Sequence, residues 1–263
     1  MRENGHVKSV ERGLKILEIL GSSSMPLTLT EVSNRAELTI TTTQRFINTL
    51  FALGYLNRDE NKRYALGTKV LSLGFQFLNT SSLVSMARPY LDELSSELEM
   101  TVNLTVLDDC DVLILYRSEV RKFLKLDVHA GSKLFAYGSA LGRVLLASLD
   151  DEDMDRRLNE MNIQQLTEKT IVSKKDNIAE IVKARKNGYV VSDRELTMDL
   201  CSIAVPVNNK DNETVAAINV SIDVLRLGDP EVTETAKRKL FEKGRRISGN
   251  LGYGGRYPKI FHA

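Results

Sequence analysis

The sequence predicts an α+β protein of two domains, and three observations carry that prediction. Residues 28–66 combine two short helical segments with a basic hairpin, which is the pattern of a winged helix-turn-helix. From Met100 onward the apolar residues recur at every second position, as in strands. Helical segments flank those strands, and 263 residues are enough for two cores. We expect a winged helix-turn-helix domain over 1–66, a linker helix over 67–81, and a domain with a mostly antiparallel sheet over 82–263.

A first helix is expected from Ser9 to Leu20. Val10, Leu14 and Leu17 lie on one stripe of it, and an apolar stripe of this kind packs against neighbouring helices. Gly21 is placed to end the helix. The segment is therefore predicted to brace the helix-turn-helix.

Two caps define the helix-turn-helix itself. Thr28 and Glu31 have the spacing of a capping box, so a helix should begin at Leu29. A short break follows, and Thr39 is placed to cap a second helix. That second helix is expected from about Ile40 to about Leu53.

The outward face of the second helix suits DNA. It carries hydrogen-bond donors and acceptors, and no acidic residue occurs between Leu38 and Asn57, where a carboxylate would repel phosphates. The side chains expected to face a duplex are Thr41, Thr42, Gln44, Arg45 and Asn48 on this helix, and Arg58, Lys62 and Arg63 on the hairpin. The competing interpretation is an ordinary solvated helix face.

The linker is apolar on more than one side. Its large apolar residues are Val70, Leu71, Leu73, Phe75, Phe77 and Leu78. A helix of this kind needs a partner surface. We interpret it as part of a dimer contact, with burial against its own chain as the alternative.

The second domain is expected to alternate strands with flanking helices. Strands are predicted at 102–106, 112–116, 123–128, 189–192, 202–207 and 214–221. Helices are predicted at 83–98, 151–162, 174–186 and 230–251, with Pro89 marking a kink or a fresh start in the first of them. Residues 131–149 should form a loop that enters a helix.

Composition excludes several classes of function. Hydrophobic residues make up 42% of the chain and charged residues 27%, the net charge is +1, and no apolar run reaches membrane-spanning length. The charged N-terminus is unlike a signal peptide, so we expect a cytoplasmic protein without a membrane partner. Two cysteines and three scattered histidines predict neither a disulfide nor a metal site. We expect no cofactor and no catalytic residues.

Four stretches together resemble a known family. They are ELTITTTQRFINTLFALGYLNRDENKRYALG, GSKLFAYGSALGRVLLASL, KNGYVVSDREL and DLCSIAVPVNNKDNETVAAINVSI. In this order and at these separations they are similar to the signatures of IclR-family transcriptional regulators, and the resemblance covers nearly the whole chain. It implies a GAF-like effector-binding domain, homodimers that often pair into homotetramers, and control of operator binding by a small carboxylate or aromatic metabolite.

Details of two stretches resemble the branch that controls protocatechuate and 4-hydroxybenzoate catabolism. They are residues 137–144 and 219–221. Phe135 departs from the family, which generally has proline there, at the expected mouth of the ligand pocket.

The resemblance also implies a set of effector-binding residues. Matched position by position, they are Ser139, Ala140 and Leu141 at a helix start, and Ser192, Ser202, Asn219 and Ser221 on strands. Tyr137 either stacks on a ligand ring or fills the core. Arg117, at a strand end, either pairs with a ligand carboxylate or stays solvated.

Two other functions stay open from the sequence. One is a GAF-like enzyme with an appended DNA-binding module, using Cys110 or Cys201. Cys110 lies in an acidic turn, which would raise the pKa of its thiol and lower its reactivity. The other is a DNA-binding protein without an effector.

Overall fold

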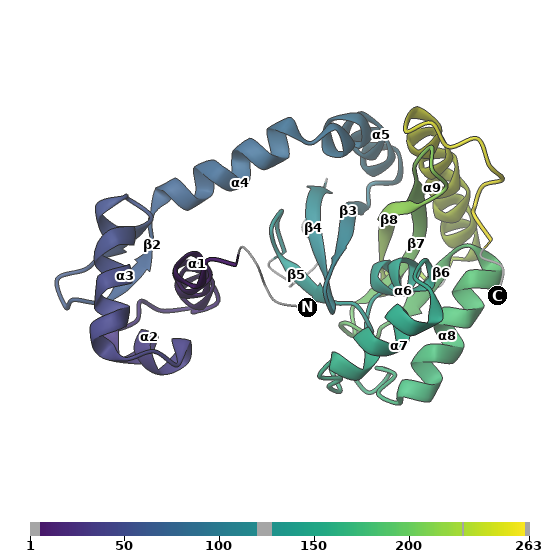
Figure 1. The fold of residues 1–263 in the computed structure, drawn as a ribbon. Coiled ribbons are helices and arrows are strands. Elements are labelled where there is room, and N and C mark those ends of the chain that lie inside the picture. The colour runs from purple at the N-terminus through teal and green to yellow at the C-terminus, as the bar shows by residue number, and fades with distance from the viewer. Residues whose placement is uncertain (1–5, 120–127, 228, 261–263) are drawn as a thin grey trace. The chain divides into compact units, whose positions relative to one another are not determined.

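The computed structural model describes residues 6–119, 128–227 and 229–260. The chain divides into two compact units, Met1–Asn79 and Thr80–Ala263. The predicted linker, 67–81, contains the point of division. Most elements of both units are labelled in Figure 1.

The N-terminal unit contains helices α1 (Lys8–Gly21), α2 (Leu29–Ala36), α3 (Ile40–Ala52) and α4 (Thr68–Thr80), with a hairpin of β1 (Leu56–Arg58) and β2 (Tyr64–Leu66). Its core is formed by Ile16, Leu20, Leu27, Val32, Ala36, Ile47, Leu56 and Tyr64. The winged helix-turn-helix expected from the sequence is therefore confirmed.

Local capping determines where α2 and α3 begin. Thr28 accepts a hydrogen bond from the Glu31 backbone N–H, and the Glu31 side chain accepts one from the Thr28 backbone, so the capping box is complete. Thr39 caps α3 by accepting from the Thr42 N–H. These local hydrogen bonds explain why the sequence located both helix starts correctly.

The predicted stripe of α1 is wrong in part. Val10 and Leu14 are exposed, whereas Ile16 and Leu20 face the core. Two apolar stripes of α1 overlap in sequence, and only packing decides between them. In the hairpin, Tyr55, Lys62 and Arg63 lie outside the paired residues of the two strands.

The C-terminal unit is built on one antiparallel sheet of six strands in the order β5-β4-β3-β8-β7-β6. The strands are β3 (Thr101–Asp108), β4 (Asp111–Ser118), β5 (Lys133–Phe135), β6 (Val190–Asp193), β7 (Leu200–Asn208) and β8 (Thr214–Asp223). Pairing of β3 with β8 joins the first three strands to the last three.

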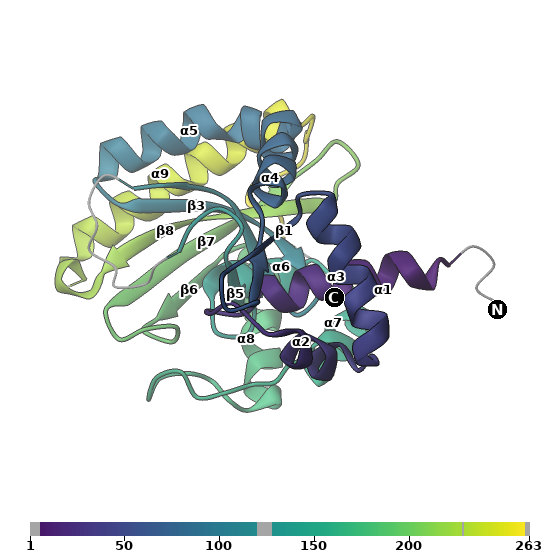
Figure 2. The same cartoon turned by 90° about the vertical axis from the view of Figure 1, so that its left-hand side faces the viewer.

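Helices cover both faces of this sheet. α5 (Ser82–Leu98) and α9 (Pro230–Asn250) pack on one face, and α6 (Ala140–Ala147) packs on the other with α8 (Lys174–Asn187) behind it. Figure 2 shows this three-layer arrangement, with α7 (Asp151–Glu160) beside α8. A short 3-10 helix, Val224–Arg226, follows β8. The predicted α+β fold is confirmed.

Two details differ from the sequence prediction, and a third is not tested. β5 lies where a loop was expected, because its three residues pair with Asp111–Leu113 of β4. α5 runs through Pro89 without a fresh start. The strand expected at 123–128 lies outside the described residues except for Val128. Within the described ranges, no single helix is long and apolar enough to cross a bilayer. α4 and α5 reach the required length and apolar content only when they are taken together, and the chain bends sharply between them.

Candidate functional site

The outward face of α3 presents the predicted polar side chains. Thr41, Arg45 and Asn48 are exposed, and Thr42 and Gln44 are half-buried. Gln44 Nε2 donates to Asn48 Oδ1 at 2.7 Å, so the two amides form one unit on the helix surface. The inward residues Thr43 and Ile47 are fully buried.

The three basic residues of the hairpin are held differently. The Arg58 guanidinium lies 5.7 Å from the centre of the Phe51 ring. Lys62 is exposed in the turn. Arg63 is turned back towards its own domain, since its Nη1 donates to the Pro26 carbonyl at 3.1 Å and lies 3.7 Å from Glu31. Arg58 and Lys62 are therefore better placed than Arg63 to reach another molecule.

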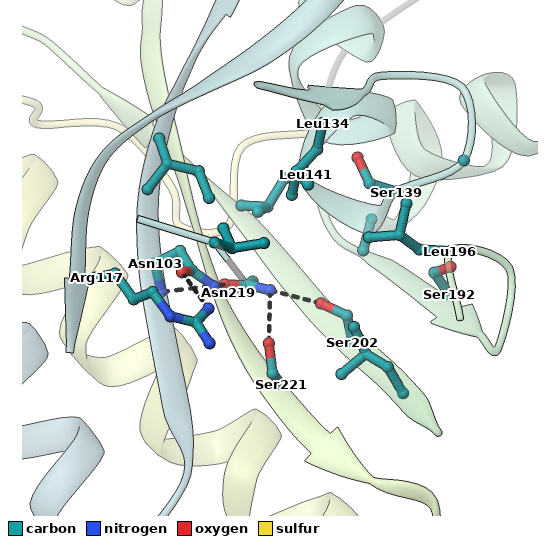
Figure 3. A pocket seen from close by; sticks show the side chains of 15 residues that line it. Asn103, Arg117, Leu134, Ser139, Leu141, Ser192, Leu196, Ser202, Asn219 and Ser221 are labelled. Carbon is teal, nitrogen blue, oxygen red and sulfur yellow. Dashed lines mark hydrogen bonds between the residues drawn. The ribbon is translucent and has the colours of Figure 1, made fainter. Parts of the chain in front are cut away.

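A cavity of about 40 Å³ lies in the C-terminal unit between the sheet and the start of α6 (Figure 3). Eight of the predicted effector-binding residues line it. They are Arg117, Ser139, Ala140, Leu141, Ser192, Ser202, Asn219 and Ser221. The structure thus brings together side chains and backbone from four strands and one helix end.

Tyr137 is the predicted residue that does not line the cavity. Its side chain is buried, and its hydroxyl accepts from the Gln164 N–H at 3.0 Å and donates to the Gln164 carbonyl at 3.1 Å. Its ring lies 5.4 Å from that of Phe135. This placement favours the interpretation that Tyr137 fills the core over the interpretation that it stacks on a ligand.

A chain of hydrogen bonds crosses the sheet face of the cavity. Arg117 Nη1 donates to Asn103 Oδ1 at 3.0 Å, and Asn103 Nδ2 donates to Asn219 Oδ1 at 2.8 Å. Asn219 Nδ2 in turn donates to Ser202 Oγ at 2.7 Å and Ser221 Oγ at 3.3 Å. The register of β3 with β8 places Asn103 directly opposite Asn219. Buried amides are costly when unpaired, and here each one finds its partner.

The start of α6 forms the opposite wall. Ser139 caps the helix by accepting from the Gly142 N–H at 3.0 Å. Ala140 and Leu141 occupy the first turn, where free N–H groups and the helix dipole favour an anion. A Cβ atom on Gly142 would lie 2.2 Å from the Ala136 carbonyl oxygen, so only glycine allows this close approach.

A buried ion pair lies behind the cavity. Arg143 of α6 donates to both oxygens of Glu195, at 2.6 and 2.5 Å, and Ser192 Oγ donates to Glu195 Oε1 at 3.2 Å. Arg143 also contacts Asn177 Oδ1 at 3.4 Å. Glu195 thus ties the loop after β6 to α6. Arg143 is 1% exposed and Glu195 6% exposed, so this ion pair is buried.

Sequence reasoning missed several lining residues, namely Asn103, Ile114, Val128, Gly138, Leu134, Leu196 and Leu200. Asn103 carried no distinctive signal, because polar residues alternate with apolar ones along β3 and Thr101 and Thr105 share its pattern. Leu134, Leu196 and Leu200 carried none, since apolar residues at such positions are ordinary core.

The environment of the two cysteines opposes thiolate chemistry. Burial, followed by the charge of Glu160, raises the pKa of the Cys110 thiol. Burial and a hydrogen bond to Asp193 raise the pKa of Cys201 to about 12. Both thiols are free. Within the described ranges, no cluster of histidine, cysteine and carboxylate side chains is arranged to hold a metal.

Comparison with family models identifies both units. Residues 9–60 match the IclR helix-turn-helix domain, and residues 75–249 match the model described as bacterial transcriptional regulator IclR C-terminal. The second match alone covers more than half of the chain.

Two relatives and one solved structure are informative. The Pca regulon regulatory protein of Pseudomonas putida is 34% identical over 227 residues, which is 86% of this chain and 78% of that protein. The p-hydroxybenzoate hydroxylase transcriptional activator of Acinetobacter baylyi is 30% identical over 224 residues, covering 83% and 82%. An IclR homologue of Microbacterium hydrocarbonoxydans, crystallised with 4-hydroxybenzoate, superposes with a TM-score of 0.76 at 21% identity, covering 92% and 98%. At this level of identity, the last comparison shows a shared fold.

We predict that both thiols react slowly in the native protein. Because the pKa of each thiol is raised, the thiolate fraction at pH 8 is small, and Cys201 is also buried. Ellman's reagent should label the native chain much more slowly than the same chain unfolded in guanidinium, which serves as the control. Rapid labelling of either native thiol would contradict this reading and revive cysteine chemistry.

Proposed function

Since the chain belongs to the IclR family of bacterial transcriptional regulators, we propose that it binds operator DNA through α3 and the hairpin, and that a small carboxylate in the C-terminal cavity controls this binding. An aromatic acid is the effector that we favour. The observation that carries the proposal is the donor-rich cavity between the sheet and the start of α6.

The DNA-contacting role of α3 rests on chemistry and exposure. Arg45 is exposed on a helix face without carboxylates, beside the Gln44 and Asn48 amides. Arginine pairs bidentately with guanine or binds phosphate, and these amides can read adenine. Arg58 and Lys62 on the wing would contact phosphate or the minor groove. We place the protein in the cytoplasm on the same ground, because its proposed target is DNA.

Replacing Arg45 with Ala should weaken operator binding by about 1–3 kcal/mol, because one guanidinium contact is lost. Fluorescence anisotropy with an operator fragment at matched salt measures the loss. Lys175→Ala is the matched control, since it removes the same charge from an exposed site on α8. Equal affinities of wild type and Arg45→Ala would rule out the contact.

The proposed effector follows from the donors in the cavity and from the relatives. Serine hydroxyls, two asparagines and the N–H groups of α6 surround the cavity, and such groups suit a carboxylate. Two relatives are named for regulation of aromatic acid metabolism, and a structural neighbour was crystallised with 4-hydroxybenzoate. We propose that this chain belongs to the same branch.

Binding of an aromatic acid should raise the unfolding temperature of the full-length chain. A ligand at about a hundred times its Kd stabilises the native state by roughly 2.7 kcal/mol. A thermal-shift panel of protocatechuate, 4-hydroxybenzoate, benzoate, pyruvate and glyoxylate tests this, with methyl 4-hydroxybenzoate as the control that lacks the carboxylate. Stabilisation by pyruvate or glyoxylate alone would exclude the aromatic class.

We propose that the chain acts as a homodimer, or as a homotetramer of paired dimers. Leu71, Leu73 and Phe75 of α4 are 68%, 52% and 59% exposed, and α4 has no buried residue. Val10 and Leu14 of α1 are exposed as well. Apolar surface on this scale is typical of an interaction site, and a helix-turn-helix protein gains affinity by binding two half-sites.

Phe75→Glu should weaken self-association, because it places a charge in the proposed apolar contact. Light scattering should give at least twice the chain mass for the wild type and a smaller mass for the variant. Lys175→Glu, an exposed substitution outside α4, is the control. A wild-type chain that is monomeric at micromolar concentration would refute the proposal.

We also propose that the chain is not an enzyme. The relatives are named as regulators, and the raised pKa of each thiol removes the nucleophile on which the enzyme alternative depended. The cavity in turn disfavours a DNA-binding protein without an effector.

A further inference from the structure

In the chain of hydrogen bonds that crosses the cavity, each residue donates to the next, and Arg117 is the first donor. A guanidinium only donates hydrogen bonds, so the Asn103 atom 3.0 Å from Arg117 Nη1 must be the side-chain oxygen. The Asn103 amide nitrogen therefore faces Asn219, and the atom of Asn219 that it contacts must be the oxygen. The Asn103 backbone N–H also donates to this Asn219 oxygen, at 3.1 Å. Arg117 thus fixes the orientation of the Asn103 amide, and the side chain and backbone of Asn103 together fix that of Asn219.

The consequence appears at the serines. Because the Asn219 oxygen faces Asn103, its amide nitrogen donates to Ser202 Oγ and Ser221 Oγ. Each serine accepts from Asn219 and keeps its own proton for a molecule in the cavity. Ser139 behaves similarly, since its Oγ accepts from the Gly142 N–H. These hydroxyls are donors towards a ligand, as a carboxylate requires.

Ser192 has the opposite polarity. Its Oγ lies 3.2 Å from Glu195 Oε1, and Arg143 holds Glu195 as a carboxylate through two short hydrogen bonds. A carboxylate only accepts hydrogen bonds, so Ser192 donates its single hydroxyl proton to Glu195. It therefore offers only lone pairs to the cavity, and a ligand group beside it has to be a donor.

The serine that accepts from a ligand and the serines that donate to it lie in one row across the sheet. Ser192 pairs with Ser202 between β6 and β7, and Ser202 pairs with Ser221 between β7 and β8. Neighbouring strands are about 4.8 Å apart, so Ser192 and Ser221 are separated by roughly 10 Å. Figure 3 shows Ser202 between the other two. A benzoic acid with a donor opposite its carboxylate has the right form for this row.

We propose that Arg117 and Glu195 are positioning residues that give the cavity a donor end and an acceptor end, so that it selects acids bearing a hydrogen-bond donor over acids without one. The inference rests on the carboxylate effector proposed above and specifies the second group that this effector carries. In this role Arg117 acts through Asn103 and Asn219, without itself pairing with the ligand carboxylate.

Four ligands of similar shape test the acceptor end. They are 4-hydroxybenzoate and 4-aminobenzoate, which carry a donor, and 4-fluorobenzoate and benzoate, which do not. In calorimetric titration of the full-length wild type, the first two should bind about tenfold more tightly or better, because the other two leave Ser192 unpaired. Ser192→Ala should remove this preference by weakening only the donor-bearing acids.

The ion pair is tested as a unit. The double variant Arg143→Met with Glu195→Leu removes both charges, which avoids leaving one of them buried and unpaired. It frees the Ser192 hydroxyl to donate, so the preference for donor-bearing acids should shrink while benzoate still binds. Circular dichroism checks that the variant is folded. If it is not, the comparison of the four acids on the wild-type chain still tests the proposal.

Asn219→Ala tests the donor end. It removes the amide that donates to Ser202 and Ser221 and leaves Arg117 in place, so all four acids should lose affinity by a similar factor of about ten. Direct pairing of Arg117 with the carboxylate would leave their affinities unchanged, which would overturn the positioning role of Arg117. Lys175→Ala is the control.

The outcomes separate this inference from the proposed effector. If 4-fluorobenzoate binds as tightly as 4-hydroxybenzoate, the acceptor end is refuted and the carboxylate effector stands. If none of the four acids binds the wild type, the aromatic effector fails and the inference falls with it.

Discussion

The pairing of β3 with β8 is the contact on which the C-terminal unit and its cavity depend. It joins two groups of three strands into one sheet, and it brings together Asn103 and Asn219, which are 116 residues apart in sequence. Both amides are buried, so the contact stabilises the sheet only because their polar atoms are paired. A contact so distant in sequence costs loop-closure entropy when it forms. The cavity therefore exists only in the completed sheet.

The sequence located local features well and distant ones poorly. The starts of α2 and α3 follow from Thr28 and Thr39, whose hydrogen bonds reach only three residues along the chain. β5 was missed because its pairing with β4 is tertiary. Asn103 was missed for a related reason, since its partners are on other strands. In α1, periodicity offered two stripes, and the packing of Ile16 and Leu20 decided between them.

In the candidate cavity, too, the sequence predicted some features and missed others. Resemblance supplied the residues of α6 and of the strand positions, because those are motif positions in the chain. It did not supply the directions of their hydrogen bonds, which depend on Arg117 and Glu195 acting across the sheet and across a loop. β4 also presents Tyr116 to the opposite face, where its hydroxyl lies 2.5 Å from Asp92 of α5. One strand thus contacts both the cavity and the helix that follows α4 in the chain.

The close approach of Gly142 to Ala136 bears on how such a protein diversifies. A side chain at Gly142 would collide with the Ala136 backbone, so the start of α6 is fixed in place. Strand positions are freer, because a sheet ladder uses backbone atoms and accepts many side chains. After gene duplication, a copy that acquires a new effector is therefore expected to change at Ser192, Ser202 or Ser221. The start of α6 would stay the same in both copies. It would be the constant side of the binding site, and the strand positions would be the variable side.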